Sequence, residues 1–488
     1  MKFSSILLLI ALVAALTGCT GGQGAFPSRY PQCERQSQAV YDYLHNGDDH
    51  SADHSLDVRL ADRRADIFNQ PTEVRDGLMR ADAERTLTDC EKAIQEGRER
   101  LQEPSSNLPV GPGVTSTTIS LGVLSDFTGD FASLGKTISG SQQLFWQDQN
   151  RAGGVCGRKV DLVVKDHGYN VQNAVGLYQQ TKDHVLAYQQ LLGSPETAAL
   201  LNSIAVDGVL TQTVGWSSVV LANPYVIMSG TTYDLEMINA IDWLMKHKGL
   251  KQGDKVGHIL LAGEYGENAL AGSRQAAAAN GITLVEEKVL PTEVDMSNSV
   301  QAIRASGARY ILVTTTPKQL AAIAAATDSL NYDVTLVGNN PTFAPPLLSV
   351  PAVRSALERK FFLVTSYAPF SSTAPVPTRV RTEYMAAHPG ESYNAGVMYG
   401  YGQGEIMYKI LDAACISGSL TRPALLKAFQ KIASLNTDGL IAPLDYSQVG
   451  QPPARAVYMA QPDASTPGGL KTVQDLFSSF EAQAYRRS

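Results

Sequence analysis

The sequence predicts an α/β fold with two doubly wound parallel-sheet lobes, preceded by a small helical region. Two observations carry this prediction. From about residue 118 onward, stretches with the two-residue apolar period of strands alternate with stretches that have the apolar spacing of helices. The alternation runs in two consecutive series, 118–229 and 256–337, and each series contains enough strands for a sheet of its own.

The first series opens with a β-α-β unit. Apolar residues alternate with small or polar ones over 119–123 and again over 160–164, and helical spacing over 134–150 separates the two strands. Strands joined in this way are parallel and have a right-handed crossover. Ligands of open parallel sheets bind beyond the carboxyl ends of the strands, so we expect the loops 125–135 and 166–170 to border a pocket.

The remaining elements follow the same rule. Helices are expected to start near proline and to stop at glycine, as at Pro195 and Gly307. Further strands are predicted at 186–193, 209–211, 224–229, 256–262, 283–289, 310–314, 334–337 and 361–366. Further helices are predicted at 195–206, 235–248, 267–280, 299–306, 317–330 and 399–415.

Composition and motifs exclude several classes of function. The 488 residues carry a net charge of −7 with a pI near 5.7, and no basic stripe is present, which argues against nucleic-acid binding. The loop after the first strand contains only Gly129 where a dinucleotide-binding loop needs three glycines, so a small ligand is favoured over NAD. The sequence has no GxSxG, no HExxH and no glycine loop ending in GK[ST]. We therefore predict no enzyme activity, no cofactor and no metal.

The N-terminus resembles a bacterial lipoprotein signal. Residues 1–19 comprise a short positive start, an apolar run over 6–16 and the sequence LTGC, which is similar to a lipobox ending at Cys19. The resemblance implies lipid on Cys19 and attachment to the membrane surface. The alternative is an ordinary signal peptide cleaved near Gly18.

Three segments separate this signal from the first lobe. Residues 20–29 are predicted to be a tether, 30–102 a charged helical region, and 103–116 a linker rich in Pro, Gly and Ser. The helical region contains no functional motif. It is either a spacer that holds the rest of the chain off the membrane or a surface for a partner.

Several motifs, in order, resemble the branched-chain (Leu/Ile/Val) amino-acid binding proteins of ABC importers, which have the type I periplasmic binding fold. The first is SDFTGDFASLG, followed after a helix by NRAGGVCGRKVDLVVKDHGYN. Later segments agree: EYGE at 264–267 is similar to the family's "YG" turn, and 395–411 to its late helix. The matches stay in register over about 118–448.

The resemblance implies two lobes joined by a three-strand hinge. Lobe 1 would comprise 117–235 and 367–447, and lobe 2 would comprise 236–366 and 448–488. Closure around a small solute would then present the protein to an ABC permease. The implied protein is a monomer, located outside the cytoplasm and anchored to the bacterial cell membrane. The alternatives are an envelope-assembly lipoprotein that regulates cell-wall synthases and a sensory solute receptor.

Four cysteines remain when Cys19 carries lipid, and an even number in an exported chain favours disulfides. Three connectivities are possible. We prefer Cys33–Cys90, which brackets the helical region, and Cys156–Cys415, which in the type I fold would join two helices of the same lobe.

The resemblance also implies ligand contacts. Tyr265 would contact the ligand from lobe 2, and Tyr401 is the aromatic residue of the late helix. Thr197 stands at a helix N-terminus, where free N–H groups suit a ligand carboxylate. Thr213 and Trp216 lie in the next strand-end loop. For Thr197, Trp216 and Tyr265 the alternative is a role in packing or capping alone.

One departure concerns the ligand's charge. Where the family's amino-acid binders place an acidic residue against the ligand ammonium, this chain has Asn339 and Asn340. An amide accepts a hydrogen bond but gives no charge pairing. The ligand is therefore predicted to be either a branched-chain amino acid or another small carboxylate, amide or aromatic compound, with Asn340 as a contact.

Overall fold

The computed structural model describes residues 37, 40–41, 44–45, 64–102 and 108–486. The chain divides into two compact units, Met1–Pro104 and Ser105–Ser488. In the first unit, helix α4 (Thr72–Gln102) is the longest described element, and Leu44, Ile67 and Met79 form a small apolar core. The predicted signal, the lipid on Cys19 and the pairing of Cys33 with Cys90 lie outside the described residues and side chains.

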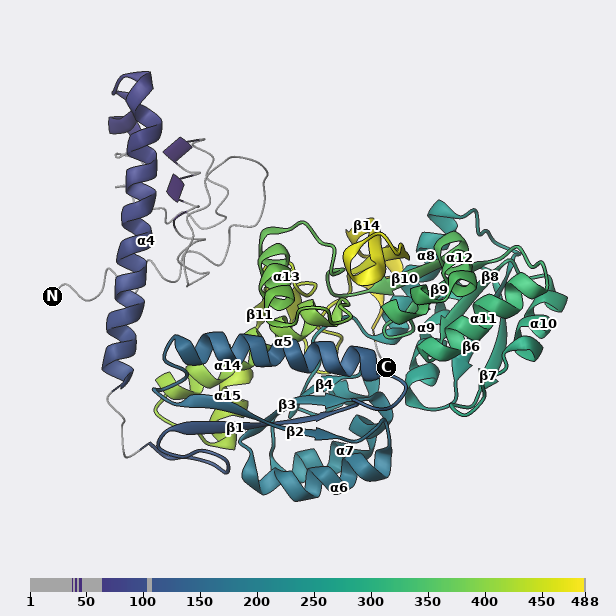
Figure 1. Cartoon of the computed structure of the whole chain (residues 1–488), viewed down its shortest axis with the longest axis horizontal. Helices are drawn as coiled ribbons and strands as arrows, with labels where there is room; N and C mark the ends of the chain where they lie inside the picture. Colours follow the sequence, from purple (N-terminus) through teal and green to yellow (C-terminus); the bar gives the residue numbers. More distant parts are fainter. Residues whose placement is uncertain (1–36, 38–39, 42–43, 46–63, 103–107, 487–488) are drawn as a thin grey trace. The chain divides into compact units, whose positions relative to one another are not determined.

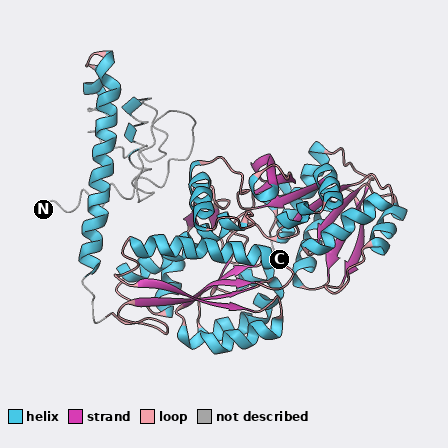
Figure 2. Ribbon diagram, in the orientation of Figure 1, coloured by secondary structure: helices cyan, strands magenta, loops and turns pink. Residues whose placement is uncertain are grey.

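The second unit contains a five-stranded parallel sheet in the order β2-β1-β3-β4-β5. Its strands are β1 (Thr118–Ser125), β2 (Lys159–Asp166), β3 (Ala187–Leu192), β4 (Thr211–Val214) and β5 (Val226–Ile227). Helices cover both faces of the sheet (Figure 2). On one face lie α5 (Ala132–Arg151) and α14 (Gly396–Ile416), and on the other lie α6 (Val171–Thr181) and α7 (Ser194–Asp207), as Figure 1 shows.

A seven-stranded sheet forms the second lobe, in the order β14-β13-β10-β9-β8-β6-β7. Strands β13 and β14 are antiparallel additions to a parallel core. The strands are β6 (Lys255–Leu261), β7 (Thr283–Val289), β8 (Tyr310–Thr314), β9 (Thr335–Asn339), β10 (Phe361–Thr365), β13 (Val457–Pro462) and β14 (Leu470–Phe477). The helices around this sheet are α8 (Tyr233–His247), α9 (Glu264–Ala279), α10 (Ser297–Ser306), α11 (Pro317–Ser329) and α12 (Pro351–Lys360).

A smaller group of elements completes the second unit. Strands β11 (Ser434–Leu435) and β12 (Leu444–Asp445) pair with each other, and α13 (Pro375–Ala387) and α15 (Arg422–Phe429) pack near α14. The chain ends with the short helix α16 (Phe480–Ala484) against α8. Within the described part of the chain, no helix combines the length and the apolar character that a membrane span requires.

The fold matches the predicted α/β architecture with two parallel-sheet lobes. Strands β7 and β8 have the predicted bounds, because clear turn signals flank both. Strand β4 begins where the predicted strand 209–211 ends, since the sequence favours Val209 and Leu210 as strand residues but only Thr211–Val214 join the ladder. The predicted elements do not include helices α6, α12, α13, α15 and α16 or strands β11, β12, β13 and β14.

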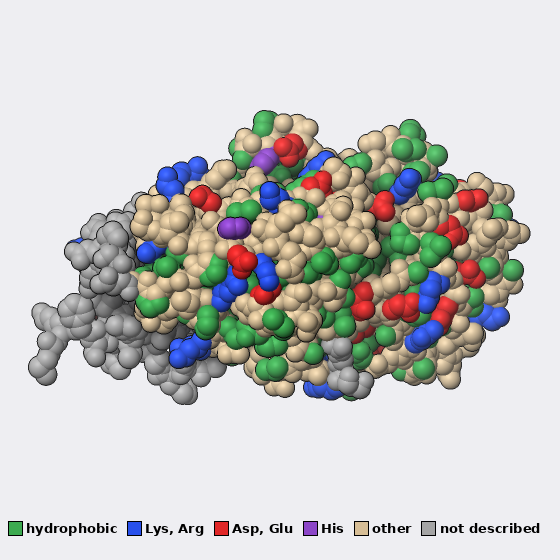
Figure 3. Space-filling view, turned by 90° about the horizontal axis from the view of Figure 1, so that it is seen from below, with side chains coloured by type: hydrophobic (Ala, Val, Ile, Leu, Met, Phe, Trp, Pro, Cys, Tyr) green, Lys and Arg blue, Asp and Glu red, His purple; other side chains and the backbone are tan. Residues whose placement is uncertain are grey.

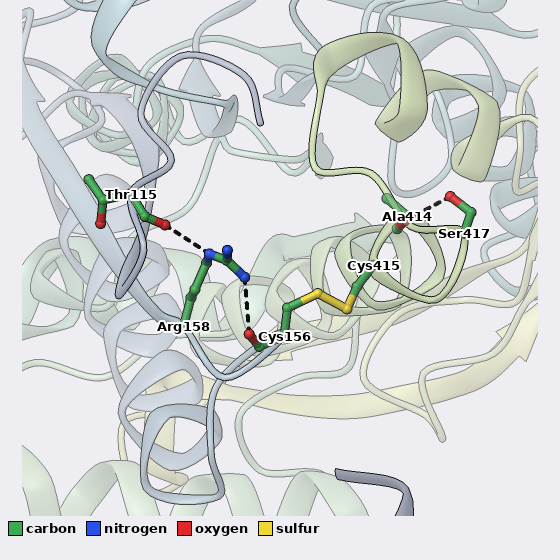
Figure 4. Close-up of a disulfide and its surroundings, with 6 residues drawn as sticks. All are labelled: Thr115, Cys156, Arg158, Ala414, Cys415 and Ser417. Atoms are coloured by element: carbon green, nitrogen blue, oxygen red, sulfur yellow. Dashed lines mark hydrogen bonds between the residues drawn. A yellow bond between two sulfur atoms is a disulfide. The ribbon is translucent and has the colours of Figure 1, made fainter. Parts of the chain in front are cut away.

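A disulfide joins Cys156 to Cys415, the second pairing preferred from the sequence, with the two Cα atoms 6.0 Å apart (Figure 4). It links the turn after α5 to the end of α14, and these helices pack along each other over the sheet. The turn is held by Arg158, whose Nε donates to the Thr115 carbonyl over 2.8 Å and whose Nη1 donates to the Cys156 carbonyl over 3.1 Å. The bridge therefore fixes the amino-terminal edge of the first sheet.

Candidate functional site

The carboxyl ends of both parallel sheets face a shared cleft between the lobes. Strands β1 and β2 pair in register from Thr118↔Lys159 to Ser125↔Asp166, so the loops that follow them start side by side. Asp166 ties these loops together, because its carboxylate accepts from the Phe127 N–H over 3.0 Å and from the Thr128 hydroxyl over 2.9 Å. This is the edge at which open parallel sheets bind ligands.

Two cavities occupy the cleft. The larger has a volume of about 30 Å³ and the smaller about 10 Å³. The larger is lined by Asp130, Phe131, Ser133, Leu134, Pro317, Asn340, Pro341, Phe343, Ala344, Leu363, Tyr367, Asn394, Ala395, Gly396 and Leu470. The smaller is lined by Phe131, Leu134, Tyr169, Leu192, Gly193, Ser194, Val214, Trp216, Tyr233, Tyr265 and Pro341. Both cavities thus combine aromatic walls with a few polar groups, as small-molecule sites do.

Tyr265, in the first turn of α9, lines the smaller cavity. Its ring packs against Tyr233 at 4.7 Å and meets Phe131 edge-on at 6.3 Å. Its hydroxyl donates to Oδ1 of Asn339 over 2.9 Å and lies 3.0 Å from the Thr342 hydroxyl. Burial raises the pKa of Tyr265 well above its usual value, so the hydroxyl stays a donor. Phe131 belongs to the first lobe, so this ring contact spans the cleft.

Two polar contacts also join the loop after β4 to α9. Ser217 donates from Oγ to Oε1 of Glu264 over 2.5 Å, and Asn268 donates from Nδ2 to Oγ of Ser218 over 2.6 Å. Together with the Phe131–Tyr265 contact they hold the lobes against each other beside the smaller cavity.

Trp216 is almost fully buried, at 1% exposure, and lines the smaller cavity. Its ring packs against Tyr399 at 5.1 Å, Tyr367 at 5.8 Å and Tyr233 at 6.0 Å. Its indole Nε1–H has no protein partner. A Cβ on Gly230 would lie 3.0 Å from this nitrogen, so a side chain at that position would press against the indole.

Of the six predicted ligand contacts, Trp216 and Tyr265 line the smaller cavity and Asn340 lines the larger one. The buried hydroxyls of Thr197 and Thr213 lie 3.0 Å apart, and that of Thr197 also donates to the Gly193 carbonyl. Neither threonine lines these cavities. Ligand contact stays a prediction for all five of these residues.

Tyr401 also lies outside both cavities. Its ring packs edge-on against Phe145 of α5 at 5.1 Å, and its hydroxyl accepts from Nη1 of Arg379 over 3.3 Å. These contacts hold α14 against α5 and α13. A ligand contact by Tyr401 likewise stays a prediction.

Sequence reasoning missed two buried carboxyl groups near the cleft. Glu196 is in the first turn of α7, 1% exposed, and neither of its carboxyl oxygens has a protein partner. Burial raises its pKa to about 7. A side chain on Gly193 would overlap Oε2 of Glu196, which places this carboxyl at the helix N-terminus where we expected a ligand carboxylate. The sequence marks this turn, but nothing in it indicates that Glu196 is buried there.

Glu236, in the first turn of α8, is the second carboxyl group. Its Oε1 accepts from Nδ2 of Asn340 over 2.9 Å, and its Oε2 has no partner. Burial raises its pKa well above the usual value. An acidic group therefore does stand beside Asn340, supplied by a helix that lies 104 residues away in the sequence. No local pattern could have revealed this pairing.

Neither basic side chains nor a metal site is found among the described residues around the two cavities. No Lys, Arg or His is among the residues that line the two cavities. No group of three or more His, Cys, Asp or Glu side chains is placed to hold a metal ion in the described part of the chain. On the face drawn in Figure 3, acidic and basic side chains are interspersed among the described residues.

Comparison with known proteins agrees with this architecture. Residues 118–467 match the family model "Periplasmic binding protein". Among solved structures, the chain is similar to a fatty acid ABC transporter substrate-binding protein from Thermomonospora curvata. That similarity has 37% identity and a TM-score of 0.76, and covers 78% of this chain and 97% of the other. No curated protein sequence matches the chain.

More distant structures share the fold. A branched-chain amino acid ABC transporter protein from Thermus thermophilus with bound valine is 16% identical, with a TM-score of 0.67 over 77% of this chain and 99% of that one. A solute-binding protein from Rhodopseudomonas palustris BisB5 in complex with 3,4-dihydroxybenzoic acid is 19% identical, with a TM-score of 0.63 over 74% and 97%.

The chain belongs to the periplasmic binding protein family. Its fold is the type I periplasmic binding fold of ABC transporter substrate-binding proteins, as the resemblance in the sequence had implied. It is thus a solute-binding protein of an ABC transporter, and the family's place of action is outside the cytoplasm.

Proposed function

We propose that the protein captures a small solute between its two lobes and delivers it to the permease of an ABC importer. The observation that supports this most strongly is the convergence of strand-end loops from both sheets on shared aromatic cavities. The solute is a branched-chain amino acid or another small carboxylate, amide or aromatic compound. The protein acts by binding and closure, without catalysis and without a cofactor, and lipid on Cys19 holds it at the membrane.

A thermal-shift screen of residues 20–488 against these compound classes tests the proposal. A ligand at one hundred times its dissociation constant stabilises the native state by about 2.7 kcal/mol, which raises Tm by a few degrees. The shift should shrink in Tyr265→Phe, which loses the hydroxyl bound to Asn339. The matched control is Tyr332→Phe, whose hydroxyl bonds the Ala308 carbonyl elsewhere in lobe 2.

The contradicting result is equally clear. No shift from any compound, combined with no co-purified ligand in native mass spectrometry, would remove the solute-binding proposal. Binding to a cell-wall synthase in a pull-down would then support the envelope-assembly alternative.

A further inference from the structure

A row of hydrogen bonds runs from the C-terminal segment to the contact between the lobes. The hydroxyl of Tyr485 donates to Oδ2 of Asp234 over 2.9 Å. Asn268 makes two longer contacts with Asp234, because its Oδ1 accepts from the Asp234 N–H over 3.3 Å and its Nδ2 lies 3.5 Å from Oδ2. The same Nδ2 donates to Oγ of Ser218 over 2.6 Å. Ser218 follows β4 of the first sheet, whereas Asp234 and Asn268 lie on helices of the second, so this last bond crosses the cleft.

The amide of Asn268 can point only one way in this arrangement. A backbone N–H donates and a carboxylate oxygen accepts, so the amide oxygen has to face the Asp234 N–H and the NH₂ group has to face the carboxylate. One amide hydrogen is then left for Ser218. The side chains of Asp234, Ser218 and Asn268 belong to residues that are 1%, 4% and 9% exposed, so bulk water competes little for these bonds. Asp234 therefore orients the donor that crosses the cleft.

Other groups hold the Asp234 carboxylate in place. Thr232 donates its hydroxyl hydrogen and Leu235 its backbone N–H, and both are close neighbours in the sequence. Tyr485 donates from 251 residues away. Arg455 holds that end of the chain, because its Nη1 donates to the Tyr485 carbonyl over 2.8 Å. The position of the Asp234 carboxylate thus depends on the C-terminal segment.

These contacts act on the closing of the lobes and not on the solute. Asp234, Asn268 and Tyr485 line neither of the two cavities. The bond from Asn268 to Ser218 joins two protein groups, so it stabilises the closed cleft whichever solute is bound. Loss of one such bond changes the ratio of closed to open molecules by roughly two- to tenfold.

We propose that Tyr485 is a positioning residue for closure, which acts through Asp234 to orient the Asn268 amide that donates across the cleft to Ser218. The C-terminal segment thereby tunes the affinity for solute from outside both cavities. This inference rests on the proposed function, in which closure captures the solute.

Hydrogen exchange of the tryptophan indoles, followed by NMR on residues 20–488, measures closure without any solute. Trp216 lines the smaller cavity, is 1% exposed and directly precedes Ser217, so water reaches its Nε1–H when the lobes part. Its exchange rate is then proportional to the fraction of open molecules. Trp146 is the internal control, because its Nε1–H donates to Gln189 inside the first lobe and exchanges only when that core opens.

Three variants cut the row at different points: Ser218→Ala, Asn268→Ala and Tyr485→Phe. Each should speed exchange of the Trp216 indole by roughly two- to tenfold, and the Trp146 rate should stay unchanged. Tyr310→Phe is the matched control, because its hydroxyl donates to the Lys248 carbonyl over 2.7 Å in the second lobe. It should leave both rates as they are in the natural protein.

A double variant tests whether Tyr485 acts through Asn268. Added to Asn268→Ala, Tyr485→Phe should cause no further rise in the Trp216 rate. A general loosening of the C-terminal segment would instead add its effect in full. If Asn268→Ala does not fold, Ser218→Ala takes its place as the background.

The outcomes separate this inference from the receptor function. Unchanged Trp216 exchange in Ser218→Ala and Asn268→Ala overturns the role of the bond across the cleft, and an equal rise for Trp146 does the same because it indicates general destabilisation. Unchanged exchange in Tyr485→Phe, or an additive effect in the double variant, overturns the positioning role of Tyr485. None of these results decides whether solute binds, which the thermal-shift screen measures independently.

Discussion

A carboxyl group that is buried without a partner makes the stability of this protein depend on pH. The pKa of Glu196 is raised by burial to about 7 in the folded chain, against about 4.5 when unfolded. The folded form therefore binds this proton more tightly, and the free energy of unfolding falls as pH rises from about 4.5 to about 7. Above that range the folded state has to bury a charge.

Glu196→Gln should remove the free-energy cost of burying this charge. At pH 8 the variant should be more stable than the natural protein by about 3 kcal/mol, because a pKa difference of this size corresponds to that free energy. At pH 4 the two should be equal. Urea unfolding at both pH values measures the difference. The exposed Glu391→Gln serves as control, and an equal gain at pH 4 would show that the effect is packing and not ionisation.

Where a motif marks a loop, the sequence pointed to side chains that line a cavity, and their contact with a ligand stays a prediction. Trp216 and Tyr265 were found because strand-end loops and a turn motif identify them, and both line a cavity. Glu236 was not found, because its role depends on a contact with Asn340 that only the folded chain creates. The sequence does not mark the carboxyl of Glu196 either, because a charged residue in a first helical turn normally faces solvent.

The disulfide acts at the scale of elements, since it joins the ends of α5 and α14 across 259 residues of sequence. In the chain-entropy description, a cross-link that closes so long a loop strongly reduces the conformational entropy of the unfolded chain. We expect the double variant Cys156→Ser/Cys415→Ser to lose about 2–5 kcal/mol of unfolding free energy.

Ligand affinity should stay within about threefold in the same variant, because the bridge lies at the amino-terminal edge of the sheet and the cleft lies at the carboxyl edge. Denaturant unfolding and calorimetric titration measure the two quantities. Natural protein treated with dithiothreitol is the control. An unchanged unfolding free energy in both samples would mean that the packing of α5 against α14 alone stabilises this edge of the sheet.

Element prediction was most reliable where apolar period and punctuation agree. Strands β7 and β8 are flanked by glycine, proline or threonine turns and were placed with their observed bounds. Helix α13 and the pair β13 and β14 were not predicted because their sequences lack a clear apolar period, and packing against other elements determines them. Local pattern gives no information about such tertiary partners.

At the scale of the molecule, the proposed attachment to the membrane depends on one side chain, that of Cys19. If Cys19 is acylated, the natural protein should incorporate labelled palmitate in bacterial cells and enter the detergent phase, as expected for a lipid anchor. Cys19→Ala should do neither. Mass spectrometry of the mature N-terminus gives an independent reading, and an unmodified chain beginning near residue 19 would establish an ordinary signal peptide instead.

The order in which the chain is made has a consequence for when its cores can close. Strand β1 and helix α5 come early in the sequence, yet α14, which covers the same face of the sheet, follows some 250 residues later, as the disulfide separation of 259 shows. Likewise, the sheet that contains β6 is complete only after β13 and β14 have been synthesised. At bacterial synthesis rates this interval is roughly 10–50 s. When a chain crosses a membrane with its N-terminus first, the cores of both lobes are therefore still incomplete as the early residues arrive. Cys156 can form its disulfide only after Cys415 has arrived.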